Sequence, residues 1–322
     1  MTASTATAAV IAAYNAEATL ERAVLSALSQ PDVAEVCVVD DCSNDGTGRI
    51  AEELATRDAR VRVRRAERNA GPSAARNLAI AETSTPWIAI VDADDYMLDG
   101  RLAALHRHVG DADFIADRLM RVAGDAAPPP PAAQLAPASL SFAHFVLGNL
   151  GARTGPLDLG YLKPMFRRAF IERHGLRYRE DMRLGEDYEF YARALALGAR
   201  FVTCQPAGYV SIERGGSLSK AHSETDLQRL RDCDDALASI RQFTPDERRA
   251  LKRHWNSVDC RLQWRRLISA VKNRDVGAAL STFRSPQTAA FLAARLGEQA
   301  WLRSMAFARG DAAPRARPSY PQ

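Results

Sequence analysis

The stretch Trp87-Ile88-Ala89-Ile90-Val91-Asp92-Ala93-Asp94-Asp95 decides the fold, because an apolar run ends in three carboxylates within four positions. Apolar β-branched residues bounded by polar ones predict a buried strand. Acids at the carboxyl end of a strand lie in the crevice where open α/β sheets bind ligands. Carboxylates this close raise one another's pKa unless a cation lies between them. Their oxygens suit Mg²⁺ or Mn²⁺ shared with substrate phosphates, and a solvated acidic turn is the alternative.

Outward from this stretch, strand and helix patterns alternate through the first half of the chain. Predicted strands cover Val10–Tyr14, Val36–Val39 and Val61–Val63, the last more polar and nearer an edge. Asn15 is the expected cap of the first helix, and Gly71-Pro72 opens a later one. Repeated β-α units predict a mostly parallel α/β sheet with helices on both faces.

The second half is expected to be less regular and then helical. Five prolines between Ala126 and Pro137 predict a loop or stiff linker. Short strands are predicted at 114–116, 201–202 and 209–212. From Ser223 the pattern is helical, and Thr244-Pro245-Asp246-Glu247 has the spacing of a capping box. The expected division is 1–125 and 126–222 as two halves of one α/β domain, 223–310 as a helical region and 311–322 as a disordered tail.

Composition limits the partners and the compartment. The 322 residues carry a net charge of +4, which is too small to indicate nucleic acid. From Thr244 onward there are fifteen Lys and Arg but six Asp and Glu. This basic region suits phosphates, an anionic membrane surface or an acidic partner, or it is only a set of solvated helix faces. Five scattered cysteines without zinc spacing favour a reduced cytosolic compartment. No apolar run reaches transmembrane length, so any membrane contact is expected to be peripheral.

Two early motifs carry candidate nucleotide-binding residues. Asp40-Asp41 ends the second predicted strand, where a carboxylate accepts from a base N–H or a ribose hydroxyl. The alternative is helix capping, which Ser43 or Asn44 would do unaided. Arg76 lies one turn into the helix opened by Gly71 and would reach a phosphate or base edge. The alternative is a surface Arg paired to a nearby acid.

Two later motifs offer a base and a closing loop. Glu186 and Asp187 follow Gly185 at a predicted helix start, where acids are favoured by the helix dipole or serve as a general base. The loop from Arg214 through Ser217 to Ser219 combines glycines, a cation and hydroxyls, which suits closure over a diphosphate. An ordinary turn is the alternative. His222 is expected to be exposed rather than a metal ligand.

Taken together and in this order, these motifs resemble the inverting family 2 glycosyltransferases of the GT-A fold. The matching segments are Val10–Asn15, Val38–Thr47, Asn69–Asn77, Val91–Asp95 and Gly185–Asp187. For the nucleotide, the resemblance implies that Ala12 and Tyr14 line the base pocket, that Asp41 receives the uracil and that Arg76 lies near the nucleotide. For the metal, it implies that Asp92 and Asp94 form the D-x-D motif and that Asp95 and Asp94 bind Mg²⁺ or Mn²⁺. For the reaction, it implies that Asp187 is the general base with Glu186 beside it, and that Arg214 and Ser217 belong to the closing loop.

The resemblance also implies a reaction. The segment from Gly160 to Asp187 is similar to transferases of bacterial exopolysaccharide assembly such as succinoglycan. These move a hexose from a UDP-sugar, here expected to be UDP-glucose, to a glycan or lipid-linked oligosaccharide. Gln263-Trp264-Arg265-Arg266 only superficially matches the Q-x-x-R-W motif of processive synthases, so one sugar per encounter is expected. The implied location is the cytoplasm, with peripheral contact at the cytosolic face of the inner membrane.

Two other functions stay open at this point. A sugar-nucleotide pyrophosphorylase is also α/β and metal-dependent, but it needs a glycine-rich basic signature that Val10–Asn15 lacks. A non-catalytic nucleotide-sugar-binding assembly protein is the second, and the acids retained at Asp41, Asp92–Asp95 and Asp187 count against it. The sequence does not determine the oligomeric state.

Overall fold

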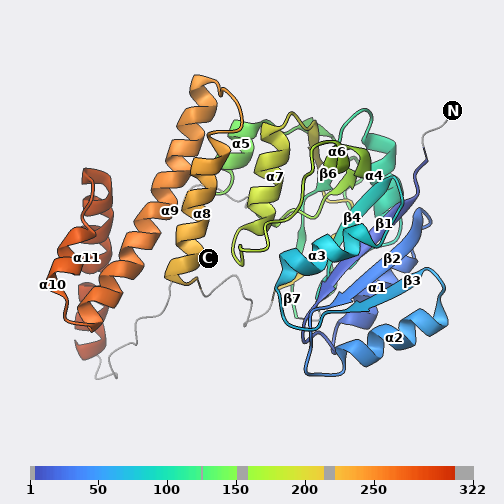
Figure 1. The fold of residues 1–322 in the computed structure, drawn as a ribbon, viewed down its shortest axis with the longest axis horizontal. Helices are drawn as coiled ribbons and strands as arrows, with labels where there is room; N and C mark the ends of the chain where they lie inside the picture. Colours follow the sequence, from blue (N-terminus) through green and yellow to red (C-terminus); the bar gives the residue numbers. More distant parts are fainter. Residues whose placement is uncertain (1–3, 125, 151–158, 214–221, 309–322) are drawn as a thin grey trace. The chain divides into compact units, whose positions relative to one another are not determined.

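The structure, a computed structural model, describes residues 4–124, 126–150, 159–213 and 222–308 (Figure 1). The chain forms two compact units. The first comprises Met1–Phe145 and Leu159–Gly215, and the second Val146–Asp158 and Gly216–Gln322. The domain boundaries at 125, 222 and 310 stay predictions.

The first unit is built on a mostly parallel sheet with the strand order β3-β2-β1-β4-β9-β6-β10-β8. Four neighbouring strands are all parallel, namely β3 (Val61–Arg65), β2 (Val33–Asp40), β1 (Thr7–Ala13) and β4 (Trp87–Asp92). Their carboxyl ends therefore meet at one edge of the sheet, which is where the predicted acids lie. The polar strand β3 lies at the edge of the sheet, as predicted.

The second half of this sheet has a different character. β9 (Met165–Arg167) runs antiparallel to both of its neighbours, β4 and β6 (Phe114–Asp117). β10 (Phe201–Cys204) is parallel to β6, and β8 (Ala138–Ser139) closes the edge. A separate three-stranded sheet has the order β5-β11-β7, with bounds Tyr96–Met97, Tyr209–Glu213 and Met120–Ala123.

Helices flank the sheet because the helical connections between its strands carry apolar stripes that have to be buried. Their bounds are α1 Leu20–Leu28, α2 Thr47–Arg57, α3 Pro72–Ala81, α4 Arg101–His108, α5 Phe142–Leu147, η1 Leu159–Tyr161, α6 Arg168–Arg173 and α7 Glu186–Ala196. The prolines of 126–137 lie in a segment without helix or strand, as predicted.

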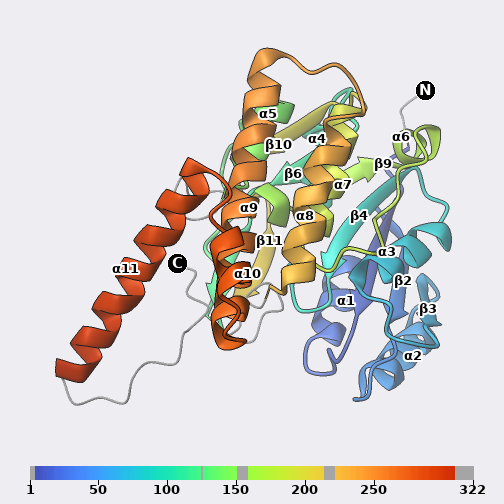
Figure 2. The same cartoon turned by 60° about the vertical axis from the view of Figure 1, so that its left-hand side comes forward.

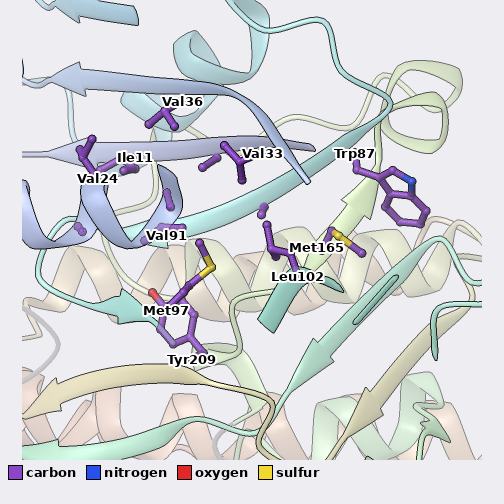
Figure 3. Close-up of a cluster of buried hydrophobic side chains, with 14 of the residues drawn as sticks. Ile11, Val24, Val33, Val36, Trp87, Val91, Met97, Leu102, Met165 and Tyr209 are labelled. Atoms are coloured by element: carbon purple, nitrogen blue, oxygen red, sulfur yellow. The ribbon is translucent and has the colours of Figure 1, made fainter. Parts of the chain in front are cut away.

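Two cores hold the sheet. In the first, Ile11 of β1 and Val91 of β4 belong to one buried cluster with Val24 of α1 (Figure 3). Val10 is equally buried and lies on the opposite face, because side chains alternate along a strand. The second core is aromatic. Phe114 of β6 stacks on Phe166 of β9 at 5.1 Å between ring centroids and also contacts Phe170, Phe190 and Phe201.

The described part of the second unit is helical, with α8 (Glu224–Leu237), α9 (Pro245–Lys272), α10 (Val276–Ser281) and α11 (Pro286–Ala308) (Figure 2). Thr244 and Glu247 form the predicted capping box, with Pro245 in the first turn. A second capping box joins Ser223 and Asp226. Every helix among the described residues is too short or too polar to cross a bilayer.

Two local expectations were wrong, and one alternative is excluded. Asn15 caps no helix: α1 begins at Leu20, because residues 16–19 first form a turn, and the Asn15 Oδ1 accepts from the Asn44 N–H instead. Neither Ser43 nor Asn44 caps α2, since Gly46 precedes it without a side-chain bond. His222 is buried rather than exposed, and burial followed by Arg261 and Arg265 lowers the pKa of His222 to about 4.

Candidate active site

The acids of the stretch that decides the fold cluster where β4 ends. Asp92, Asp94 and Asp95 each offer a carboxylate oxygen, and these oxygens lie within 4.8 Å of one another. Burial, and then the carboxylates of Asp92 and Asp94, raise the pKa of Asp95 to about 7. Asp95 Oδ1 also accepts from the Ile212 N–H at 2.9 Å, which fixes one of its oxygens. An all-oxygen donor set under mutual repulsion fits Mg²⁺ or Mn²⁺.

Asp92 differs from Asp95 because it is bound by two cations. Arg76 Nη2 lies 2.9 Å from Asp92 Oδ1, and Lys163 Nζ lies 2.9 Å from Asp92 Oδ2. Burial opposes its ionisation, but Lys163 and Arg76 outweigh this and lower the pKa of Asp92 to about 2. The Asp92 N–H donates to the Tyr209 hydroxyl. Asp92 is thus a carboxylate that two cations hold in place.

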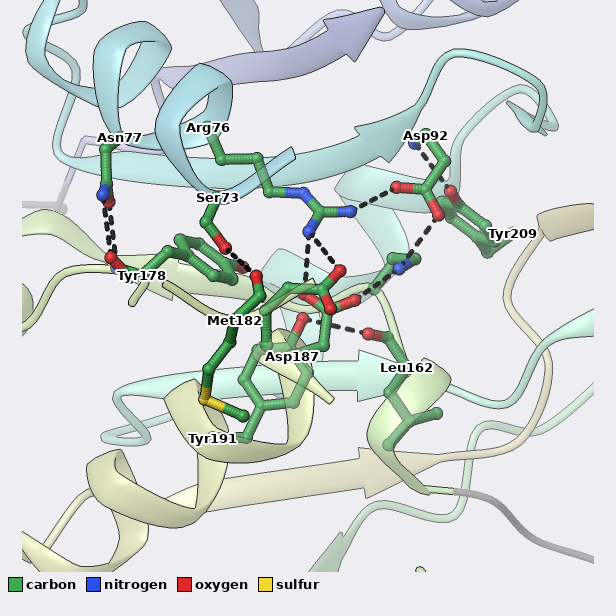
Figure 4. A network of polar contacts seen from close by, with 12 residues as sticks. Ser73, Arg76, Asn77, Asp92, Leu162, Tyr178, Met182, Asp187, Tyr191 and Tyr209 are labelled. Atoms are coloured by element: carbon green, nitrogen blue, oxygen red, sulfur yellow. Dashed lines mark hydrogen bonds and ion pairs between the residues drawn. The ribbon is translucent and has the colours of Figure 1, made fainter. Parts of the chain in front are cut away.

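Arg76 links this cluster to a second pair of acids. Its Nη1 lies 3.2 Å from Glu186 Oε1 and 3.3 Å from Asp187 Oδ1, so one guanidinium contacts acids from β4 and from α7 (Figure 4). Arg76 is 5% exposed, so the alternative of a surface Arg was wrong, although its partners are acids. Gly71 adopts φ +92° at the turn before α3, a conformation that side chains disfavour.

Glu186 and Asp187 occupy the first turn of α7, after Gly185 at φ +71°. Asp187 is largely buried, and its Oδ2 accepts from Lys163 Nζ at 2.7 Å. Burial, and then the charge of Asp187, raise the pKa of Glu186. The structure therefore brings the predicted base next to the predicted metal cluster, with two cations between them.

Lys163 is the residue that the sequence reasoning missed. It lies between η1 and β9, and its side chain is 6% exposed. Burial would lower the pKa of Lys163, but Asp187 and Asp92 outweigh it and raise the pKa above its ordinary value. The available indication was one cation inside the apolar run Tyr161-Leu162-Lys163-Pro164-Met165-Phe166. Lys is almost never fully buried unless it is paired.

The predicted base-pocket residues lie further along the same sheet edge. Ala12 of β1 pairs with Asp92 on one side and with Val39 on the other. β1 therefore lies between β2, after which Asp41 follows, and β4, which leads into the acidic cluster. Asp41 accepts from the backbone N–H groups of Ala70 and Gly71, both at 2.8 Å. Tyr14 follows β1 and is exposed. Arg214 and Ser217 lie outside the described residues.

This arrangement separates two chemical tasks. Asp94 and Asp95 lie at the end of the site that suits a divalent cation. Asp187 lies at the other end, where a carboxylate with a remaining lone pair on each oxygen is able to accept a proton. Figure 4 shows the Arg76 guanidinium pointing between Asp92 and Asp187. One network of ion pairs from β4, α3, α7 and the segment before β9 therefore links Asp92 to Asp187.

Comparisons with known protein sequences agree with this geometry. The family model described as "Glycosyl transferase family 2" matches residues 8–173. The succinoglycan biosynthesis protein ExoU of Rhizobium meliloti (strain 1021) is 41% identical over 84% of this chain and 80% of its own length. The succinoglycan biosynthesis protein ExoO of the same organism is 34% identical over 85% of this chain and 79% of its own length.

Solved structures share the fold. Staphylococcus aureus TarS 1–349 in complex with UDP-GlcNAc has a TM-score of 0.63 at 18% identity, covering 86% of this chain and 90% of that one. Mannosyltransferase PcManGT from Pyrobaculum calidifontis in complex with GDP-Man and Mn²⁺ has a TM-score of 0.56 at 16% identity, covering 89% and 83%. The predicted GT-A architecture with a helical C-terminal region is confirmed. The sequence matches cover enough of the chain to show the family as well as the fold, and the chain belongs to glycosyl transferase family 2.

Proposed function

We propose that this protein is an inverting hexosyltransferase that uses a UDP-sugar, with UDP-glucose the expected donor, and a divalent metal. The observation that carries the proposal is the single guanidinium of Arg76, which contacts both Asp92 and Asp187. It ties the end that suits a metal and a diphosphate to the end that suits a base. An inverting transfer needs these two functions on opposite sides of one anomeric carbon.

The residues divide between donor and acceptor. Ala12, Tyr14 and Asp41 hold the base of the nucleotide, with Asp41 receiving the uracil. Asp94 and Asp95 hold Mg²⁺ or Mn²⁺, Asp92 orients the diphosphate end, and Arg76 lies near the nucleotide. Arg214 and Ser217 close over the diphosphate. When bound, the metal neutralises charge on the departing diphosphate.

The chemical step is one displacement. The oxygen of an acceptor hydroxyl forms a bond to the anomeric carbon while the bond from that carbon to the diphosphate oxygen breaks. UDP leaves with the electron pair of the broken bond, and Asp187 takes the hydroxyl proton. Glu186 lies beside Asp187 and shares Arg76 with it, which keeps this pair of acids partly neutralised. Attack from the opposite face inverts the configuration.

The acceptor class is proposed from the relatives. ExoU and ExoO are succinoglycan biosynthesis proteins, and each match covers more than four fifths of this chain. We take a glycan or lipid-linked oligosaccharide of exopolysaccharide assembly as the acceptor. TarS bound UDP-GlcNAc and PcManGT bound GDP-Man, so the fold accommodates more than one nucleotide. The proposal of UDP here rests on Asp41.

A donor screen tests this proposal. Purified protein is incubated with MnCl₂ or MgCl₂ and a panel of UDP-, GDP- and dTDP-sugars, with and without lipid-linked oligosaccharide extracted from an exopolysaccharide-producing cell. Release of UDP from UDP-glucose that requires metal and rises with acceptor supports the proposal, and an inverted product linkage by NMR completes it. No turnover of any donor with a full acceptor panel would show a non-catalytic binder instead. Turnover of GDP-sugars alone would overturn the choice of UDP.

We propose that the protein acts at the cytosolic face of the inner membrane. On the second unit, the large apolar side chains of Val276, Leu280 and Trp301 are 71%, 69% and 61% exposed. The exposed cations Arg274 and Arg303 lie within two residues of Val276 and Trp301 in the sequence. Apolar side chains beside cations complement an anionic bilayer surface.

Vesicle co-sedimentation tests the membrane contact. The protein is expected to pellet with phosphatidylglycerol-containing vesicles and to stay in solution with pure phosphatidylcholine. Trp301→Ser should release it, whereas Leu25→Ser, which changes an exposed apolar residue of α1 on the first unit, should not. Equal pelleting with both lipids, or concentration-dependent self-association of the free protein that Trp301→Ser abolishes, would assign this surface to another partner.

A further inference from the structure

Hydrogen bonds to the backbone hold the segment that carries Lys163 in place, independently of the contacts that the Lys163 side chain makes. Arg101 is fully buried and its Nη2 donates to the Lys163 carbonyl oxygen at 2.7 Å. The Tyr191 hydroxyl donates to the neighbouring Leu162 carbonyl oxygen at 3.0 Å. Tyr191 lies one turn after Asp187 on α7, so the same helix holds both the base and the backbone of the lysine segment.

The base is held through both of its oxygens. Asp187 Oδ2 receives the Lys163 ammonium at 2.7 Å, and Oδ1 receives Arg76 at the longer distance of 3.3 Å. Arg76 is shared among three acids, whereas Lys163 divides its charge between Asp187 and Asp92. Lys163 is therefore the closer anchor of the base. A carboxylate that abstracts a proton needs its lone pair aimed at the incoming hydroxyl, and a small misplacement is costly.

We propose that Lys163 is a positioning residue, which aims the Asp187 carboxylate and sets its place relative to the diphosphate end through Asp92; this rests on the proposed function of Asp187 as the base. Lys163 keeps all of its protons throughout the step. The proton of the acceptor goes to Asp187, and the electron pair of the broken bond leaves with UDP. The lysine thus supplies orientation and charge, and no atom is transferred to or from it.

Removal of the ammonium followed by its return in solution tests the proposal. For Lys163→Ala, kcat for UDP release from UDP-glucose in the presence of acceptor is expected to fall about a hundredfold or more. The KM for UDP-glucose and the Kd of UDP with MnCl₂ are expected to stay within about threefold, because the loss falls on the transition state. Added methylammonium should raise kcat by about tenfold, since it returns a charged N–H donor to the vacated space.

Matched controls separate positioning from a structural role. Tetramethylammonium has the same charge without an N–H donor and should give no rescue. Lys252→Met removes an exposed lysine from α9 of the second unit and should change nothing. If Lys163→Ala unfolds, Lys163→Gln keeps most of the side-chain length and a neutral donor, and the same kcat and KM measurements are made on it.

Several results would overturn the proposal. One is a kcat near wild type in Lys163→Ala or Lys163→Gln. Another is an equal loss of kcat and UDP affinity with no response to methylammonium, which would make Lys163 a donor-binding or purely structural residue. These outcomes differ from failure of the proposed function, in which the wild-type protein itself turns over no nucleotide sugar, or Asp187→Asn remains active.

Discussion

Asp117→Asn is expected to be among the most destabilising conservative changes in the first unit. Asp117 is fully buried at the end of β6. Its Oδ1 accepts from Arg101 Nε at 2.9 Å and Nη2 at 2.7 Å. Its Oδ2 accepts from the backbone N–H groups of Ala207, Gly208 and Tyr209 at 2.9, 3.1 and 3.1 Å. Both oxygens face only donors in this set, so an amide placed either way turns an N–H toward other N–H groups.

The magnitude follows from the charge that is left behind. Asparagine leaves Arg101 buried without a counter-charge, and breaking a buried pair by removing one partner costs about 3–5 kcal/mol. In a unit of this size each kcal/mol lowers Tm by roughly 2–4 °C. The first unit should therefore melt roughly 6–20 °C lower in differential scanning calorimetry.

The control is Asp111→Asn, which also removes one carboxylate from an Arg pair but at an exposed position, since Asp111 is 84% exposed and contacts Arg200. Exposed pairs contribute about 0–1 kcal/mol, so its Tm should change little. A shift for Asp117→Asn no larger than that of Asp111→Asn would refute the reasoning that the Arg101–Asp117 pair is charged and buried. It would also weaken the argument that Arg101 holds the Lys163 carbonyl oxygen in place.

Three further outcomes are expected. Asp187→Asn should abolish transfer while the Kd of UDP measured by calorimetry stays within about threefold, because the amide keeps the shape of the base but accepts no proton; equal loss of both would contradict the base assignment. Asp95→Ala should remove the MnCl₂ dependence of UDP affinity in the same titration, and an unchanged, metal-independent affinity would argue against a metal role for Asp95. N-ethylmaleimide at neutral pH should label Cys42 before the other cysteines. Burial raises the pKa of Cys37 to about 11 and that of Cys204 to about 12, and Cys233 and Cys260 are also buried. Rapid labelling of Cys37 in the native protein, measured by mass spectrometry, would contradict the described packing.

The sequence could predict features that depend on short-range pattern. The apolar run at Trp87–Val91 is a central strand, and Val61–Arg65 lies at the sheet edge because its pattern is more polar. Gly71 and Gly185 mark the turns before α3 and α7, where each adopts positive φ. In these cases the polarity and the turn residues of a short segment indicate the outcome.

What the sequence could not predict depends on contacts between distant residues. Lys163 meets Asp92 and Asp187 only because β9 is inserted antiparallel between β4 and β6, and no local periodicity specifies that insertion. Strand order likewise decides that β1 separates Asp41 from Asp92. The roles assigned to the site residues stay proposals until the variants above are measured.

The position of β9 also has a consequence for synthesis of the chain. β1 to β4 are complete once residue 92 has been made, but the neighbour on the other side of β4 begins only at residue 165. At the usual rate of translation the intervening residues take roughly 4–15 s. During that interval no partner from its own sheet exists for the far edge of β4, and unpaired strand edges promote association between chains. β9 thus covers the open edge of β4 and joins it to β6, which was made earlier.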